Sequence, residues 1–295
     1  MVLKGRLGLE TARIPHADRH GLLWLSRGNL YVENGTLRFQ CAGSPDLSAG
    51  DYAIPFQTVS LVLLGPGTTV SHDALRLTAR HGTGLAAVGD DGVRFYTAPP
   101  LGPDDSRLAR RQARLWADAD GARLSVARRL YAWRLGEVLP HQDIAVLRGI
   151  EGARMKETYR LLAGKYGVRW QGRRYDRANP NAADAPNQAI NHAASAVEAA
   201  AGLAVAATAT IPQLGFIHED SSNAFVLDVA DLFRDRATLP IAFQAVRQAE
   251  KEPQVPLERH VRRIAGRSFR QDGVIDAMIG RIKELFDADD RGGHP

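Results

Sequence analysis

The sequence predicts an α+β fold, with a small β-rich N-terminal domain followed by a larger and mostly α-helical domain. Residues before about 100 contain short apolar segments separated by Asn-Gly and Asp-Gly pairs, which is typical of strands joined by hairpins. Beyond that point alanine, leucine and arginine dominate, and apolar residues recur with helical spacing. Between the two parts, the segment APPLGPDDS contains three prolines and one glycine, which indicates a linker. We therefore expect a β-rich domain over residues 1–97, a linker over 98–106 and a helical domain over 107–295.

The N-terminal elements are predicted mainly from turn chemistry. The segment HGLLWLSRGNLYVENGTLRFQ reads as strands with a hairpin turn at Asn34-Gly35, because both residues tolerate the positive φ of a type I′ turn. YAIPFQTVSLVLLG is predicted to be a second strand pair, and GLAAVGDDGVRFYT a hairpin around Asp91-Gly92. One helix, with Ser71 as its N-cap, interrupts the strands. The single cysteine, Cys41, excludes an intrachain disulfide and is expected to be a small buried side chain.

The C-terminal part is expected to be mostly helical, with helical periodicity over residues 107–136, 143–166, 187–210, 236–251 and 256–288. A chain of 295 residues with 44% hydrophobic and 24% charged content can bury a sizeable core and is ordinary for a globular protein. No apolar run reaches the roughly 18 residues that span a bilayer, and the N-terminus MVLKGRLGLE lacks the apolar segment of a signal peptide. We therefore expect a cytoplasmic protein without a membrane partner.

Basic residues are unevenly distributed along this chain, whose formal net charge is +5. Residues 1–100 are nearly neutral, with nine Lys and Arg against eight Asp and Glu. Residues 107–134 carry eight arginines against two aspartates, and residues 148–177 carry nine basic against three acidic residues, so each segment is +6. Such clusters can be solvated helix faces, but beside candidate metal ligands they indicate contacts with nucleic-acid phosphates.

Three short segments supply candidate metal ligands. Glu151 lies in GIEGAR, His218 in GFIHED, and both Asp228 and Asp231 in NAFVLDVADLF. On a helix the two aspartates share one face and repel each other unless a cation or basic group neutralises them. Two carboxylates and an imidazole suit Mg²⁺ or Mn²⁺ better than structural zinc, and such a site beside basic helices suggests phosphodiester chemistry. Spacing alone also allows structural roles: Glu151 can be a carboxylate at a helix start, and His218 a packed or capping side chain.

Other motifs in the sequence are weaker. Gly65 and Gly67 follow a strand as in a dinucleotide-binding loop, but Val70 stands where a third glycine is required, so a tight turn is expected. The run SHD at 71–73 has the residue types of a catalytic triad, but adjacent side chains at a helix start point in different directions. The sequence contains no HExxH, CxxC or Walker motif.

The order of Glu151, His218 and Asp231 within GIEGAR, GFIH and DVADLF resembles that of the CRISPR adaptation integrase family. The run GRLGLETARIPHADRHGLLWLSRGNLYVENGTL resembles the type I-E branch of that family, and the resemblance extends from Gly5 to Lys283. It implies a metal-dependent DNA integrase and endonuclease that inserts short foreign DNA fragments into a CRISPR repeat array. The reaction would be a transesterification, in which a 3′-hydroxyl attacks a phosphodiester.

The resemblance also implies roles for individual residues. Glu151, His218 and Asp231 would bind one Mg²⁺ or Mn²⁺ ion and act as catalytic residues together with Asp228, which would be an auxiliary group. Basic residues and one tyrosine would contact the DNA backbone, namely Arg94, Arg148, Arg154, Lys156, Arg173, Arg174, Tyr175 and Arg234. Two positions depart from the family pattern, since Glu198 replaces an aromatic residue and Thr69 an arginine found in some members.

Partners follow from the same resemblance. We expect a homodimer that works with the small ferredoxin-like partner protein of CRISPR adaptation on double-stranded DNA fragments and CRISPR repeat DNA. Because the N-terminal part is nearly neutral and rich in apolar strands, we expect residues 1–97 to supply most of the self-association surface. Two alternatives remain open: a stand-alone metal-dependent nuclease on branched DNA, which would use the same residues, and a non-catalytic DNA-binding scaffold.

Overall fold

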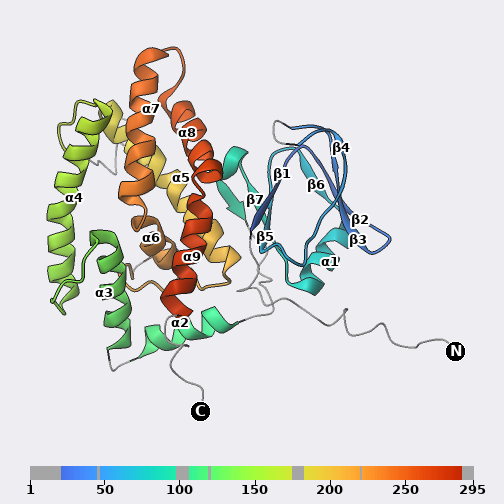
Figure 1. Cartoon of the computed structure of the whole chain (residues 1–295), viewed down its shortest axis with the longest axis horizontal. Coiled ribbons are helices and arrows are strands. Elements are labelled where there is room, and N and C mark those ends of the chain that lie inside the picture. The colour runs from blue at the N-terminus through green and yellow to red at the C-terminus, as the bar shows by residue number, and fades with distance from the viewer. Residues whose placement is uncertain are drawn as a thin grey trace.

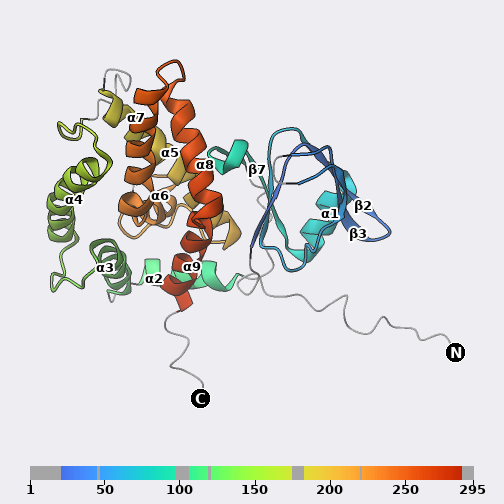
Figure 2. The same ribbon diagram turned by 45° about the horizontal axis from the view of Figure 1, so that its top comes forward.

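The computed structural model describes residues 21–44, 47–97, 106–118, 121–174, 183–219 and 221–287. The strands of this described part lie on one side of the molecule and the long helices on the other (Figure 1). The turned view shows the same separation, with β7 and the short helix next to it facing the helical side (Figure 2). The predicted α+β class, with strands first and helices after, is therefore confirmed. The predicted linker over 98–106 falls outside the described residues except for Ser106, so the domain boundaries stay a prediction.

The described strands form two four-stranded sheets. In the first sheet β1, β5 and β7 are parallel and β8 is antiparallel to β7, in the order β1 (Leu22–Leu25), β5 (Leu61–Leu64), β7 (Gly84–Val88) and β8 (Phe95–Thr97). In the second sheet β3 is antiparallel to both neighbours and β6 is parallel to β2, in the order β4 (Gly50–Ala53), β3 (Thr36–Cys41), β2 (Gly28–Glu33) and β6 (Thr68–Val70).

Both hairpins predicted from turn residues are present. Asn34 (φ 50°) and Gly35 (φ 77°) join β2 to β3, and Asp91 (φ 56°) and Gly92 (φ 70°) lie in a short 3₁₀ helix, η2 (Asp90–Gly92), between β7 and β8. The strand pair predicted for YAIPFQTVSLVLLG is wrong, because β4 joins the second sheet and β5 the first. Local alternation of residues identified the strands, but pairing depends on contacts with distant segments.

Local predictions around the strands also hold. Helix α1 (His72–His81) is capped by Ser71, whose hydroxyl accepts a hydrogen bond from the Ala74 N–H at 3.2 Å. Gly67 lies in the tight turn before β6 with φ 74°, as expected for a turn glycine. Cys41 is buried with 4% of its surface exposed.

The first sheet contributes its two faces to two different hydrophobic cores. Val62 points into the core between the sheets, whereas Leu61 and Leu63 belong to the same core cluster as the helices. On the helical side η2 lies against α8 at Gly266, where a Cβ atom would lie only 2.2 Å from the Cβ of Asp91. This sheet is therefore the surface through which the β-rich part packs on the helices.

The helical part begins with α2 (Arg107–Ala117) and α3 (Ala122–Leu135), which together fill the helical range predicted over 107–136. The break follows from local chemistry: the Asp118 carboxylate accepts a hydrogen bond from the Ala122 N–H at 2.8 Å, and Gly121 has φ 101°. Helix α4 (Ile144–Tyr166) begins after its N-cap Asp143 and ends at Gly167, close to the predicted range. Helix α5 (Ala185–Ala207) is likewise close to its prediction.

The last helices surround α5, which contacts α6, α7, α8 and α9. They are α6 (Ala224–Asp231), α7 (Leu239–Lys251) after a π-helical turn η4 (Arg234–Thr238), α8 (Leu257–Gln271) and α9 (Val274–Asp287). The helical range predicted over 256–288 contains two helices, α8 and α9, because Gly273 with φ 61° separates them. Many positions of α5 that face its neighbours are alanine, which lets the helices approach closely. Within the described ranges, no helix is both long and apolar enough to cross a membrane.

Candidate active site

The predicted metal ligands come from three separate segments. Glu151 lies on α4, His218 in the loop between α5 and α6, and Asp231 at the end of α6. His218 Nε2 is 3.8 Å from Asp231 Oδ2, and Arg134 at the end of α3 contacts both Asp231 and Glu151. The fold therefore brings the three predicted ligands together around one arginine.

Asp228 lies at the base of this site and is buried, with 1% of its surface exposed. Its carboxylate accepts hydrogen bonds from the backbone N–H groups of Phe216 (2.6 Å), Ile217 (3.2 Å) and His218 (3.0 Å). It also lies 2.8 Å from His218 Nδ1. With both carboxylate oxygens engaged in this way, Asp228 orients the histidine and is a positioning residue.

The contact with Asp228 affects both the pKa of the His218 imidazole and the ring nitrogen that carries the proton. Its hydrogen bond with Asp228 raises the pKa of His218, with the charges of Asp228 and Asp231 acting in the same direction, while burial opposes the rise. In the neutral ring, a proton on Nδ1 directed to Asp228 leaves the Nε2 lone pair on the side of Asp231. An imidazole held in this way is ready to donate Nε2 to a metal ion.

Helix α2 holds the loop that carries His218. The buried Gln112 side chain donates to the carbonyl groups of Ile211 and Leu214, both at 2.9 Å, and accepts from the Ile211 N–H at 2.7 Å. One turn later Trp116 Nε1 donates to the Gly215 carbonyl at 2.9 Å. A Cβ atom at Gly215 would lie 2.3 Å from the His218 carbonyl oxygen, so only glycine fits this close turn.

Arg134 lies between the two predicted carboxylate ligands, and its side chain is only 6% exposed. Its Nη2 is 2.8 Å from Glu151 Oε1, and its Nη1 donates to Asp231 Oδ2 at 3.0 Å. The other oxygen of Asp231 pairs with Arg234 on η4. Arg134 and Arg234 therefore supply the positive charge that offsets the repulsion between Glu151 and Asp231.

The donor set fits a hard divalent cation. Glu151 and Asp231 offer carboxylate oxygens and His218 offers one nitrogen, which matches the preference of Mg²⁺ or Mn²⁺ for oxygen-rich sites. Within the described ranges, no three His, Cys, Asp or Glu side chains already stand in a metal-binding arrangement. A metal ion that used the same two oxygens would compete with Arg134 for them.

Two further charged residues border the site. Burial and the negative charge of Asp231 raise the pKa of Glu198 on α5, against the opposing charges of Arg234 and His218. Burial tends to lower the pKa of Arg234, but the charge of Asp231 and those of Tyr159 and Glu151 outweigh it, so that pKa is raised. Glu198, one of the two positions expected to depart from the family pattern, therefore adds a further acid near the predicted ligands.

Some of the predicted DNA-contact residues lie close to the ligands. Arg148 Nη2 donates to the Ile217 carbonyl at 3.4 Å, directly before His218, and Arg234 pairs with Asp231. Arg154 forms an ion pair with Glu137, and Lys156 is exposed on the same helix, α4. Helix α4 therefore carries three of the predicted DNA-contact residues on the same element as Glu151.

Two other predicted DNA-contact residues, Arg173 and Arg174, form hydrogen bonds with α5. Arg173 donates to the side-chain oxygens of Asn187 (3.0 Å) and Asn191 (2.6 Å) on α5, and the Arg174 backbone N–H donates to Asn187 at 2.9 Å. Tyr175 lies outside the described residues.

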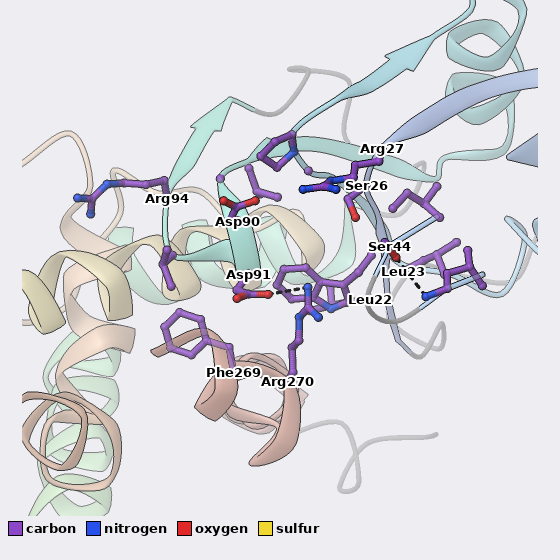
Figure 3. A pocket seen from close by; sticks show the side chains of 18 of the residues that line it. Leu22, Leu23, Ser26, Arg27, Ser44, Asp90, Asp91, Arg94, Phe269 and Arg270 are labelled. Carbon is purple, nitrogen blue, oxygen red and sulfur yellow. Dashed lines mark hydrogen bonds and ion pairs between the residues drawn. The ribbon is translucent and has the colours of Figure 1, made fainter. Parts of the chain in front are cut away.

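Arg94 lines a different part of the molecule. It faces a groove of about 1410 Å³ between the first sheet and α8, which none of the predicted metal ligands lines. Figure 3 shows Asp90 and Asp91 of η2 on one side of this groove and Phe269 and Arg270 of α8 on the other. Arg270 pairs with Asp91 at 2.6 Å, and Arg94 pairs with Glu258 at 2.7 Å.

Sequence reasoning missed four residues that shape the site. In the sequence Arg134 is only one member of a basic cluster, and its position before the helix-ending Gly136 gives no sign of its partners. Gln112 and Trp116 offer a weak signal, because they share one face of an arginine-rich helix at i, i+4 spacing. Gly215 can be recognised only from the contacts that surround it.

One protein family and two sequence relatives that are similar to this chain are all described as Cas1. The sequence model of a family described as "CRISPR associated protein Cas1" matches residues 131–255, a range that includes Arg134 and all four predicted catalytic residues. A "CRISPR-associated endonuclease Cas1" of Geobacter sulfurreducens is 37% identical over 277 residues, which cover 93% of this chain and 87% of that protein. A protein of the same description from Escherichia coli K12 is 36% identical over 276 residues, with the same two coverages.

Solved structures agree with the sequence relatives. A TtCas1–DNA complex superposes with a TM-score of 0.80 at 32% identity, over 92% of this chain and 97% of that chain. A casposase bound to an integration product shares the fold, with a TM-score of 0.63 at 14% identity, over 92% of this chain and 97% of that chain.

Proposed function

Because this chain belongs to the Cas1 family of CRISPR-associated proteins, we propose that it is a metal-dependent DNA integrase and endonuclease of CRISPR adaptation. It would insert short DNA fragments into a CRISPR repeat array by transesterification. The observation that carries this proposal is the meeting of Glu151, Asp231 and His218 in one site, with the histidine oriented by Asp228. The N-terminal resemblance further supports placing the chain in the type I-E branch.

The residues of the site have distinct roles in the proposed reaction. Glu151 and Asp231 supply oxygen ligands and His218 Nε2 supplies the nitrogen ligand, while Asp228 holds the imidazole in position. A bound Mg²⁺ or Mn²⁺ ion would polarise the target phosphate and lower the pKa of the attacking 3′-hydroxyl. The new bond joins this 3′-oxygen to phosphorus, and the bond to the bridging oxygen of the repeat strand breaks. No covalent bond to the protein is required.

DNA is the partner that both the charge and a structural relative support. TtCas1 has been solved in complex with DNA, and residues 148–177 of this chain, which include Glu151, carry a net charge of +6. Contacts from Arg148, Arg154, Lys156, Arg173 and Arg174 would follow the phosphate backbone without reading bases. Self-association into a homodimer and assembly with a small ferredoxin-like partner complete the proposal.

A second candidate is a nuclease that cuts branched DNA without inserting fragments. The relatives named as endonucleases favour it, and the same residues would carry it. The two reactions differ in the attacking oxygen, which belongs to a DNA 3′-hydroxyl in integration and to water in hydrolysis.

The experiment mixes the purified protein and its partner with a fluorescent fragment bearing 3′-hydroxyl ends and a supercoiled repeat plasmid in Mg²⁺ or Mn²⁺. Wild type should transfer the label to the plasmid, and EDTA should abolish the transfer. Asp231→Asn keeps the shape but removes the charge, so transfer should fall by about 10²-fold or more while fragment binding changes only a few-fold. Glu151→Gln should behave in the same way.

The matched control is Glu157→Gln, which removes an exposed carboxylate from the same helix as Glu151 and leaves the site intact. It should keep nearly full transfer. Plasmid cutting without label transfer would favour the nuclease candidate. Near-wild-type transfer by Asp231→Asn at low metal concentration would contradict the proposed ligand set.

A further inference from the structure

The two predicted carboxylate ligands share one arginine. The Nη2 and Nη1 atoms of Arg134 contact Glu151 Oε1 at 2.8 Å and Asp231 Oδ2 at 3.0 Å. Asp231 Oδ2 is also the oxygen nearest to His218 Nε2, at 3.8 Å. The guanidinium therefore occupies one oxygen of each carboxylate, and on Asp231 this is the oxygen nearest to the imidazole.

The Arg134 side chain is buried, and its charge is balanced by the two carboxylates that it contacts. Its side chain is 6% exposed, and its Nε and Nη2 are buried with no hydrogen-bond partner among the described residues, so Nη2 meets Glu151 as an ion pair without a hydrogen bond. A buried guanidinium is unfavourable unless negative groups balance it, and the two carboxylates are its charged contacts in the described structure. In turn, Glu151 and Asp231 are 12% and 15% exposed and would repel each other without a cation between them.

The same charges oppose a second cation. With Arg134 between the carboxylates and Arg234 on the other oxygen of Asp231, the two negative charges are already matched by two positive charges. A divalent ion that binds here would lie close to the positively charged guanidinium. The repulsion between the two cations would weaken metal binding. Metal binding through these two oxygens and the Arg134 bridge therefore compete with each other.

We propose that Arg134 is the resident counterion of the site: it holds Glu151 and Asp231 together before metal binds and releases at least one of them when metal enters. This inference rests on the proposed function, because it assumes that these two carboxylates bind the ion. Arg134 is then a positioning residue that sets the metal affinity. A purely structural ion pair would differ, since its loss would weaken the fold equally with and without metal and would not strengthen metal binding.

The test is the affinity for Mn²⁺ alone, measured without DNA by the electron paramagnetic resonance signal of free Mn²⁺. Arg134→Gln should bind Mn²⁺ about tenfold more tightly than wild type or better, because the competing charge is gone. Without metal, its melting temperature should fall, because the two carboxylates lose their shared cation. Saturating Mn²⁺ should restore more stability to Arg134→Gln than it adds to wild type.

Two controls separate competition from general electrostatics. Arg148→Gln removes a nearby positive charge that contacts the Ile217 carbonyl and neither carboxylate, so its affinity for Mn²⁺ should change much less. Glu151→Gln in the Arg134→Gln background should remove the tight binding, which locates the ion at this site. Should Arg134→Gln not fold, Arg134→Met gives the answer, because it also removes the competing charge and keeps a long unbranched side chain. It should bind Mn²⁺ more tightly than wild type.

Equal or weaker Mn²⁺ binding by the folded Arg134 variants, with Glu151-dependent binding in wild type, would overturn this inference and leave the proposed function intact. Wild-type binding that does not depend on Glu151 would overturn both.

Discussion

The Asp228 carboxylate on α6 holds the loop between α5 and α6 that carries His218, called the histidine loop below. Three backbone N–H groups and the His218 ring converge on it, and it is almost fully buried. The ring contact is also the largest cause of the raised pKa of His218. The charge state of the histidine therefore depends on a residue that does not itself need to touch a metal ion or DNA.

Asp228→Asn should lower the pKa of His218 toward its ordinary value of 6.5, because the charged partner of Nδ1 is lost. The measurement is a titration of the imidazole resonances of the metal-free protein by NMR. Asp276→Asn, a change at an exposed position of α9, controls for net charge. An unchanged His218 titration in Asp228→Asn would contradict the assigned contact.

The same variant has a second readout in stability. A raised folded-state pKa means that protonated His218 contributes stability that is fully present below 6.5 and is lost as the pH rises through the raised value. The difference in free energy of unfolding between wild type and Asp228→Asn should therefore shrink as the pH rises through that window. A difference that grows with pH would reverse the assigned sign.

At the scale of elements, α2 acts on the site through the loop that follows α5. Gln112 and Trp116 bond to four backbone groups between Ile211 and Gly215, three residues before His218. Arg123 on α3 adds an outer contact, because it stacks over Trp116 and pairs with Glu219 at 2.7 Å. The loop carrying the histidine is thus fixed on both sides, by α2 and α3 and by Asp228 on α6.

Gln112→Ala should destabilise the protein by about 2 to 3 kcal/mol, because the Leu214 carbonyl and the Ile211 N–H lose their partner and the Ile211 carbonyl keeps only its bond from the Leu214 N–H. Mn²⁺ affinity should also fall, since His218 is held less firmly. Urea unfolding and Mn²⁺ titration measure the two effects. Arg110→Ala, on the exposed face of α2, is the control and should change neither. Wild-type stability in Gln112→Ala would show that α2 does not hold the loop.

At the scale of the whole molecule, the first sheet unites the two parts. Leu61, Leu63, Ala86 and Val88 are buried in the same core as the helices, while Val62 faces the core between the sheets. Removing residues 1–97 would expose that apolar face of the helical part. The predicted role of residues 1–97 in self-association is therefore best tested by surface substitutions in the intact chain, followed by mass measurement in solution.

The shared core predicts a single cooperative unfolding transition. Hydrogen exchange with pulse labelling in urea, read by mass spectrometry, should give coincident midpoints for peptides of β5 and of α5. Leu63→Ala should destabilise both together by about 2 to 5 kcal/mol, because it opens a cavity in the common core. Two separate midpoints, with only the β5 peptide shifted, would show that the parts unfold independently.

The sequence by itself determined what depends on neighbouring residues along the chain. The order of strands and helices, the hairpins at Asn34-Gly35 and Asp91-Gly92 and the cap at Ser71 could be predicted, because turn and capping chemistry acts over a few residues. The resemblance carried by GIEGAR, GFIH and DVADLF also led to the right family.

The tertiary structure alone decided what depends on distant segments. Strand pairing placed β4 and β5 in different sheets, and folding brought Arg134 between Glu151 and Asp231 and Gln112 against the histidine loop. Hydrogen bonds and ion pairs require atoms within about 3 to 4 Å, and no periodicity records which side chains from far parts of the chain reach that distance. The candidate ligands could thus be read from the sequence, whereas the residues that orient and neutralise them could be seen only in the folded molecule.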